Sequence, residues 1–377
     1  MTSDSQSFIL GHTRCTDWQD GVAACLQQLG DIPGAANLGF LYVTDHHSDH
    51  LQAILQRLRE ATGVPHWTGT VGIGICAGGS EYHQQPAVAV MLGCFPEDSF
   101  QMLSFYGRAA DHLPATWDPW LNRSPAHLAV LHGDPANGML PELLKQLYAE
   151  LPGGYLVGGL SSSHAGHPQI ADELIEGGLS GVVFNNDVPV VTGLSQGCSP
   201  IAAQHTITDC DNNVINYIDQ RPALDVFNED IGEILARDLN RAAGYIFAGL
   251  PVSGSDTGDY LVRNLIGIDT GGKRIAIGDL LHPGQKIQFC RRDGKSAWED
   301  MQRMLDDLNS RLRGVKPRGG LYYSCLGRGD SLFGDDSAEV GMIRTALGEF
   351  PLIGFFANGE IFNQRLYGYT GVLTLFL

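Results

Sequence analysis

The chain has 377 residues, of which 43% are hydrophobic and 18% are charged, and its formal net charge is −18. Single hydrophobic cores stop growing near ~250 to 300 residues, so more than one lobe is expected, and the negative charge excludes nucleic acid as a plausible partner class. No segment reaches the ~18 apolar residues of a membrane helix, and the start MTSDSQSFIL lacks the pattern of a signal peptide. We therefore expect a cytoplasmic protein without membrane insertion.

The first elements of the chain form a recognisable pattern. Residues 37–44 (NLGFLYVT) are predicted to be a strand, and the apolar stripe from Leu51 to Leu58 predicts a helix. Two further strands are predicted at 71–76 (VGIGIC) and 87–92 (AVAVML). The order is strand, helix, strand, strand.

The same order recurs in the middle and at the end of the chain. The middle copy reads LAVLHG, a helix, YLVGGLSS and GLSGVVF, and the last copy reads LYYSC, a helix, LIGFFANG and YTGVLTLFL. The sequence therefore predicts an α+β fold of two closely packed lobes. Their mixed β-sheets would be flanked by helices and built from repeated β-α-β-β modules.

The least patterned stretch, residues 209–230, precedes a helix predicted at Ile231–Ala242. We place the boundary between two domains at its end, so that the domains span residues 37–228 and 229–365.

Two stretches match nucleophile elbows of hydrolases. Gly193–Gly197 fits G-x-S-x-G around Ser195, and Gly74–Gly78 is the cysteine form of the motif around Cys76. An elbow also needs a helix directly after the nucleophile, because the helix amino end supplies much of the oxyanion site. Neither continuation starts a helix, so a cysteine or serine hydrolase is the less favoured alternative.

Histidines are the candidate metal ligands. The run Asp45–His50 (DHHSDH) is the densest cluster, but no third and fourth ligand can be identified, and polar residues are common in the first turn of a helix. His132 ends the strand LAVLH, where strands deliver side chains to clefts. We treat His132 as the better candidate.

The stretch LYYSCLGRGDSLFG delivers Cys325 and Arg328 to a glycine hinge. A catalytic thiol needs a base, and no histidine lies in residues 283–377. Small neighbours would give the Arg328 guanidinium open access to a carboxylate, either a ligand's or that of Glu360. A pocket element is thus preferred to a nucleophile. A strand end closed by an internal bridge between Arg328 and Glu360 is equally favoured.

These motifs carry a family resemblance. SCLGRGDSLFG, GFFANGEIF and YGYTGVLTLFL resemble the carboxy-terminal half of the FIST family, and YLVGGLSS and GLSQGCSPI are similar to its amino-terminal half. The resemblance covers about residues 37–365. The family's landmarks map onto Gly193, Gly197, Cys198, Pro200, Cys325, Gly327, Arg328, Gly329, Gly359 and Glu360.

The resemblance implies a non-enzymatic sensory protein of bacterial signalling that binds a small ligand between its lobes. One stand-alone branch of the family is regarded as haem-binding nitric-oxide sensors that regulate a partner histidine kinase, so haem and such a kinase are expected. No CxxCH motif is present, so haem would be noncovalent, with His132 as candidate axial ligand and Tyr322, Phe355 and Phe356 as apolar walls. An amino-acid-like anion at Arg328 is the alternative ligand. The expected ligand-binding residues are Ser195, Gly197, Cys198, Cys325, Arg328, Gly329, Asn358 and Glu360.

Overall fold

The computed structural model describes residues 8–106, 113–151, 153–237, 239, 244–252, 259–334 and 337–377. The chain divides into two compact units, as the prediction of more than one lobe requires. Unit 1 comprises residues 1–195, 301–366 and 370–377, and unit 2 comprises residues 196–300 and 367–369. Unit 2 is therefore an insertion into the chain of unit 1. Across the described ranges, no helix is both long and apolar enough to cross a bilayer.

Module 1 of unit 1 contains the amino-terminal elements. Strand β2 (Leu38–Thr44) is followed by the 3-10 helix η1 (Asp45–His50) and by α2 (Leu51–Thr62), then by β3 (His66–Gly72) and, after a hairpin, β6 (Ala87–Gly93). β2 pairs in parallel with β3 and antiparallel with β6. Helix α2 buries its predicted apolar stripe and ends at Gly63, whose φ of 70° is left-handed.

Modules 2 and 3 repeat this arrangement. Module 2 consists of β8 (Ala126–Gly133), α4 (Leu140–Glu150), β9 (Tyr155–Leu160) and β12 (Leu179–Asn185), and module 3 consists of β22 (Gly319–Cys325), α9 (Ala338–Leu347), β23 (Leu352–Ala357) and β26 (Thr370–Phe376). In each module the first strand is parallel to the second and antiparallel to the last. The predicted α+β class, its mixed sheets and its repeated modules are thus confirmed. The modules were expected in both lobes, but all three lie in unit 1.

One glycine occupies the same register position in every module. A Cβ there would lie within 2 Å of the carbonyl oxygen that faces it on the first strand, so no other residue fits without backbone movement. The glycines and their distances are Gly69 to Leu41 O at 1.8 Å, Gly158 to Leu131 O at 1.9 Å and Gly354 to Tyr322 O at 1.6 Å. These contacts align the modules residue by residue.

The hairpins that precede each last strand are exchanged between modules. The module 1 hairpin, β4 (Gly74–Ala77) and β5 (Ser80–His83), pairs with β23 of module 3. The module 2 hairpin, β10 (Gln169–Ala171) and β11 (Glu173–Ile175), pairs with β3 of module 1. The module 3 hairpin, β24 (Glu360–Phe362) and β25 (Arg365–Tyr367), pairs with β9 of module 2. The exchange is cyclic.

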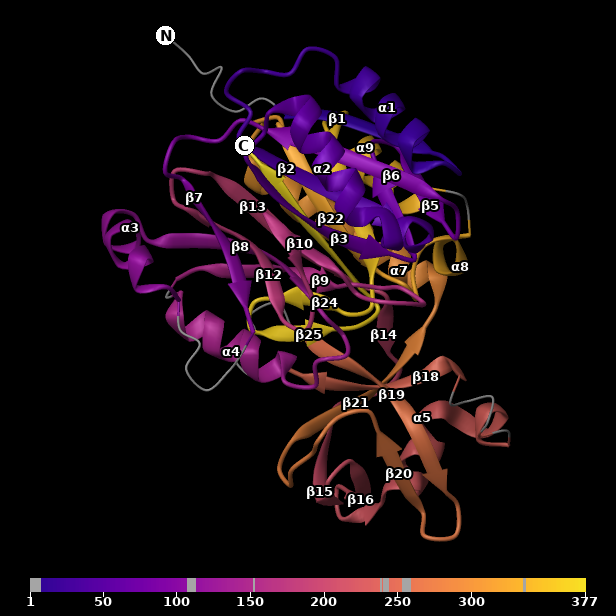
Figure 1. The fold of residues 1–377 in the computed structure, drawn as a ribbon. Helices are drawn as coiled ribbons and strands as arrows, with labels where there is room; N and C mark the ends of the chain where they lie inside the picture. The colour runs from indigo at the N-terminus through magenta and orange to yellow at the C-terminus, as the bar shows by residue number, and fades with distance from the viewer. Residues whose placement is uncertain are drawn as a thin grey trace. The chain divides into compact units, whose positions relative to one another are not determined.

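A further strand completes each sheet at its other edge. β1 (Phe8–Arg14) pairs with β6, β7 (Phe100–Phe105) with β12, and β13 (Val190–Gln196) with β26, so that each module contributes to a six-stranded sheet. Helices cover these sheets: α1 (Trp18–Leu29) and α2 bury their apolar residues against module 1 (Figure 1). Module 2 packs α4 in the same way, and module 3 packs α9 and the later part of α7 (Gly294–Leu312).

Unit 2 is a barrel. Its strands are β14 (Cys198–Pro200), β15 (His205–Asp211), β16 (Val214–Ile218), β17 (Arg221–Pro222), β18 (Ile246–Pro251), β19 (Tyr260–Asp269), β20 (Arg274–Ile277) and β21 (Lys286–Arg292). β21, β15, β16, β20, β19 and β18 pair in a ring that β18 closes onto β21. Helix α5 (Ala223–Ala236) packs Phe227 onto Phe289 in the barrel core. It begins earlier than the predicted helix Ile231–Ala242, and residues 238 and 240–243 lie outside the described ranges.

Candidate functional site

The turn after β22 positions the motif that the sequence singled out. The backbone N–H of Arg328 donates to Cys325 O at 2.8 Å, which folds the chain back at the strand end. Gly329 follows with a left-handed φ of 63°, and a Cβ on it would lie 2.6 Å from the His83 ring. Gly329 is therefore required for conformation and for space, and helix α8 (Asp330–Phe333) begins directly after it.

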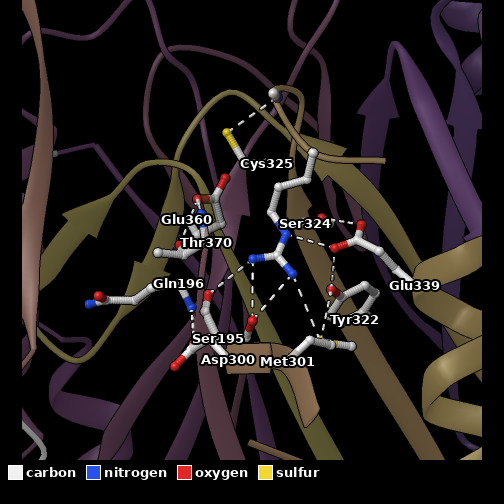
Figure 2. Close-up of polar contacts among 12 residues, drawn as sticks. Ser195, Gln196, Asp300, Met301, Tyr322, Ser324, Cys325, Glu339, Glu360 and Thr370 are labelled. Atoms are coloured by element: carbon white, nitrogen blue, oxygen red, sulfur yellow. Dashed lines mark hydrogen bonds and ion pairs between the residues drawn. The ribbon is translucent and has the colours of Figure 1, made fainter. Parts of the chain in front are cut away.

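Arg328 is buried in an ion pair with Glu339. Its Nε donates to Glu339 Oε1 at 2.6 Å, and both side chains are 0% exposed. Figure 2 shows Tyr322 and Ser324 at the same carboxylate, to which their hydroxyls donate at 3.0 and 2.7 Å. Burial opposes the charge of Arg328, but the Glu339 carboxylate raises the pKa of Arg328 above its usual value. The pair is locked inside module 3.

Ser195 holds the other end of the guanidinium. Nη1 and Nη2 of Arg328 each lie 3.3 Å from Ser195 Oγ, and Nη1 also donates to Ser195 O at 3.3 Å. The expectation that Arg328 gives a carboxylate open access is therefore wrong, because the guanidinium is fully buried. The alternative of a bridge between Arg328 and Glu360 stays a prediction. The carboxylate that the guanidinium contacts belongs to Glu339, in the first turn of α9.

Glu360 is a second buried carboxyl group in module 3. Its Oε2 accepts hydrogen bonds from Thr370 N at 3.1 Å and from Thr370 Oγ1 at 2.7 Å. Within the described residues no N–H or O–H donor reaches Oε1, although the side chain is 0% exposed. Burial raises the pKa of Glu360 to about 8, while Thr370, Arg328 and Cys325 act in the opposite direction.

Cys325 lies next to this carboxyl group. Its side chain interacts with Glu360, as Figure 2 illustrates, and the Gly327 N–H donates to its Sγ at 3.4 Å. Cys325 as a whole residue is half-buried, whereas Glu360 is fully buried. Of the two residues, Cys325 is therefore the one with solvent-exposed surface.

His132 lies where the modules meet. Its Nε2 is 2.9 Å from the Tyr42 hydroxyl, which also contacts the Tyr323 hydroxyl at 2.9 Å, and its Nδ1 is 3.4 Å from Thr68 Oγ1. Tyr42, His132 and Tyr323 directly follow the residues that face the three repeated glycines. His132 is 0% exposed, and burial lowers its pKa to about 3.

His132 therefore does not fit an axial haem ligand, because both ring nitrogens contact protein side chains in a packed core. The residues predicted as apolar walls of a haem site, Tyr322, Phe355 and Phe356, are likewise buried in the protein core. Across the described ranges, no group of three or more histidine, cysteine or acidic side chains could hold a metal ion. Within Asp45–His50, His47 is buried and contacts Cys15 O at 3.0 Å.

The two elbow motifs contain buried nucleophiles. Ser195 is 0% exposed in β13 and accepts from Arg328, and Cys76 is 1% exposed in β4. Burial raises the pKa of Cys76 well above its usual value. Strands β14 and β5 follow them in the chain, as predicted, so neither residue has the helix that an elbow requires.

The other predicted residues lie at separate places. Gly197 and Cys198 belong to unit 2, where Gly197 N donates to Tyr369 O and Cys198 O accepts from the Tyr260 hydroxyl. Asn358 is exposed, and its backbone N–H donates to Leu160 O. Of the predicted set, Ser195, Cys325, Arg328, Gly329 and Glu360 gather in module 3.

Several residues of this cluster were missed by sequence reasoning. Glu339 is a typical first-turn acid of a helix, so its pattern gave no sign of an ion pair. Glu81 and His83 reach module 3 on the exchanged hairpin: Glu81 Oε1 accepts from Val340 N, and His83 packs on Phe356. Only the pairing of β4 with β23 reveals these contacts.

Three β-α-β-β modules, an inserted barrel and a buried polar cluster at a strand end define a two-unit α+β protein. The chain belongs to the FIST family: a FIST N domain matches residues 37–221 and a FIST C domain matches residues 223–363. The predicted family is thereby confirmed, and FIST domains are associated with sensory signal transduction. The boundary at 228/229 stays a prediction.

Curated relatives extend over almost the whole chain. An uncharacterised protein of Mycobacterium tuberculosis strain H37Rv is 31% identical over 359 residues, which cover 91% of this chain and 92% of the relative. An uncharacterised protein of Mycobacterium bovis is 28% identical over 375 residues, which cover 95% of each chain. The match includes both domains.

Proposed function

We propose that this protein is a non-enzymatic sensor that binds a small ligand at the Cys325–Glu360 site of module 3 and reports its occupancy to a separate signalling protein, such as a histidine kinase. The observation that supports this proposal is Oε1 of Glu360, a buried oxygen that no N–H or O–H donor of the described chain reaches. Leaving such a group unsatisfied costs about 1 to 3 kcal/mol. A ligand that donates a hydrogen bond to Oε1 would recover that free energy.

The charges of the site favour one class of ligand. The Arg328 guanidinium already contacts Glu339 and Ser195 in a fully buried position, which argues against an amino-acid-like anion bound through its carboxylate. Glu360 offers an acceptor instead. We therefore favour ligands with an ammonium, amide or hydroxyl donor. An amino acid would bind through its amino group.

Haem and nitric oxide stay predictions that rest on the family resemblance, since His132 does not fit an axial ligand. The measurement is an absorption spectrum after haem addition. A sharp Soret band that moves with nitric oxide and persists in a His132→Ala variant would establish haem binding at another ligand. If the spectrum stays that of unbound haem, the prediction of haem binding is wrong.

Titration calorimetry with the twenty proteinogenic amino acids and a set of simple amines tests the proposal. At least one probe should bind the wild-type protein. Glu360→Gln should weaken that probe about tenfold or more, because a hydrogen bond to a charged group contributes roughly 1.5 to 3 kcal/mol. Glu142→Gln is the matched control, since Glu142 is an exposed carboxylate on α4. A panel without any binder, or equal affinity in Glu360→Gln, would refute the proposal.

A further inference from the structure

The cysteines of the chain differ in accessibility. Five are buried, and Cys15, Cys210 and Cys325 are half-buried. Burial and neighbouring aspartates raise the pKa values of Cys15 and Cys210, which keeps these two thiols protonated and slow to react. They provide an internal standard for Cys325.

Cys325 has a different environment. Its Sγ accepts a hydrogen bond from the Gly327 N–H, and its side chain interacts with the buried carboxyl group of Glu360. A backbone donor stabilises a thiolate, and a carboxylate next to a thiol can accept its proton.

We propose that Cys325 is a redox-modification site whose thiol reduces hydroperoxides, with Glu360 as the proton acceptor. This inference rests on the proposed function, because it places the sensed signal at the same site and names a reactive class for it. Hydroperoxides are small, which suits a half-buried cysteine at a strand end.

The chemical step is a displacement at oxygen. The Glu360 carboxylate accepts the thiol proton while the sulfur attacks one oxygen of the hydroperoxide, so that an S–O bond forms and the O–O bond breaks. The leaving hydroxide or alkoxide takes a proton from Glu360 and departs as water or an alcohol. Sulfur is oxidised to the sulfenic acid and the peroxide is reduced. Because Glu360 both accepts and returns a proton, a carboxyl group that titrates near neutral pH suits the step.

The equivalent position in module 2 supports a functional role for Glu360. Glu360 and Gln169 each pair with the residue that follows the repeated glycine, Gly159 and Thr70 respectively. In the amide orientation that satisfies its neighbours, Gln169 donates to Ser180 Oγ and His132 O and accepts from Asp134 N. The polar side chain at this position of module 2 is thus fully hydrogen-bonded, whereas Oε1 of Glu360 has no N–H or O–H donor among the described residues.

The test follows sulfenic acid formation in the full-length protein. Hydrogen peroxide is added with dimedone, which traps sulfenic acids, and each cysteine peptide is quantified by mass spectrometry over time. Cys325 should be labelled more than about tenfold faster than Cys15 or Cys210, since a positioned general base typically contributes roughly 100-fold or more to such a step. Equal labelling of the three thiols would overturn the inference.

Two further readouts isolate Glu360. Glu360→Gln should slow labelling of Cys325 roughly 100-fold, the usual effect of losing a general base, and leave Cys15 and Cys210 unchanged. In the wild-type protein the rate at Cys325 should rise through pH of about 8 as Glu360 ionises, with Arg328, Thr370 and Cys325 as its polar neighbours. A wild-type profile that follows those of Cys15 and Cys210 would contradict the role of Glu360 even if the variant failed to fold.

Binding and oxidation can fail separately. Cys325→Ser removes the thiol and keeps Glu360, so reversible binding of an amino acid or amine probe to this variant tests the proposed function alone. If the probe binds and Cys325 of the wild-type protein is not oxidised faster than Cys210, only the redox inference is wrong. If Cys325 is oxidised fast and no probe binds, only the proposed reversible binding is wrong.

Discussion

Modules 2 and 3 have the same backbone and different chemistry at one position. In module 2, Asp134 directly follows β8, and its carboxylate accepts hydrogen bonds from Ala136 N and Gly177 N. The Gln169 side chain accepts from the backbone N–H of Asp134. In module 3, Cys325 stands at the aligned position, beside a buried carboxyl group with one unsatisfied oxygen. Module 1 has Thr44 there, whose Oγ1 accepts from Ala87 N. The same backbone therefore accommodates fully hydrogen-bonded side chains at this position in modules 1 and 2, and module 3 differs from both.

Among the variants that test this comparison, removal of Glu339 should cause the largest loss of stability. Glu339→Ala leaves the Arg328 guanidinium buried without its carboxylate, which costs about 3 to 5 kcal/mol of unfolding free energy. Chemical denaturation measures the loss. Glu142→Ala, which removes an exposed pair with Lys145, should change stability by less than about 1 kcal/mol. Similar losses in the two variants would mean that Glu339 does not stabilise module 3.

The pH dependence of the unfolding free energy should be the next largest difference between module 3 and the other modules. Burial raises the pKa of Glu360 to about 8, so its contribution to stability is fully present below its unfolded pKa near 4.5. That contribution is lost as pH rises toward 8, by at most about 1.4 kcal/mol for each pH unit. Glu360→Gln should remove this slope from a series of denaturation curves. An unchanged slope would show that Glu360 already ionises at low pH.

The repeated glycines offer a prediction in which the modules should behave alike. Gly69→Ala, Gly158→Ala and Gly354→Ala each push a Cβ into a facing carbonyl oxygen, and each should cost about 1 to 3 kcal/mol, the usual price of overpacking. Gly138→Ala is the control, because a Cβ at Gly138 would contact nothing within 4 Å. Thermal unfolding of all four variants measures the costs. A tolerated alanine in one module would break the residue-by-residue alignment.

The smallest effect is expected in the barrel of unit 2. His205 lies between two carboxylates, with Nδ1 2.7 Å from Asp219 and Nε2 2.9 Å from Asp230. Although burial acts against the charge, these partners raise the pKa of His205, so its stabilising contribution is present below pH 6.5 and lost as pH rises through the folded pKa. The site is partly exposed, so His205→Asn should remove no more than about 1 kcal/mol at pH 5.5. Denaturation curves at pH 5.5 and 8.5 measure it. An equal loss at both pH values would argue against titration of His205.

Local patterns predicted the modules because their strands and helices have distinct apolar periods and glycine stops, as in the stretch from Leu38 to Gly63. They could not predict the hairpin exchange, since nothing in residues 74–83 specifies that they pair with Ile353–Phe355. His132 was misread for a related reason. Its strand end points to the junction of the modules, where Tyr42 and Tyr323 surround it, and a single strand carries no sign of that junction.

The environment of Arg328 also differs from the prediction, because its guanidinium is buried and paired with Glu339. The glycines on either side of it correctly indicated a tight turn. The contact between Arg328 and Glu339 joins a strand end to the first turn of a later helix, and local sequence patterns do not specify such a pairing. The unsatisfied oxygen Oε1 of Glu360 could not be predicted either, because the hydrogen bonds of a side chain depend on tertiary contacts that the sequence does not show.

The cyclic exchange of hairpins has a consequence for how the chain acquires its structure during synthesis. β4 and β5 leave the ribosome early, but the strand that receives them, β23, is among the last to emerge. The sheet of module 1 stays incomplete until β10 has been synthesised, and the sheet of module 2 stays incomplete until β24 has been synthesised. Because pairings between distant segments form slowly, unit 1 should complete its sheets only after translation ends. A chain truncated before residue 352 should leave β4, β9, β13 and β22 without the later strands that pair with them, and these open edges promote aggregation.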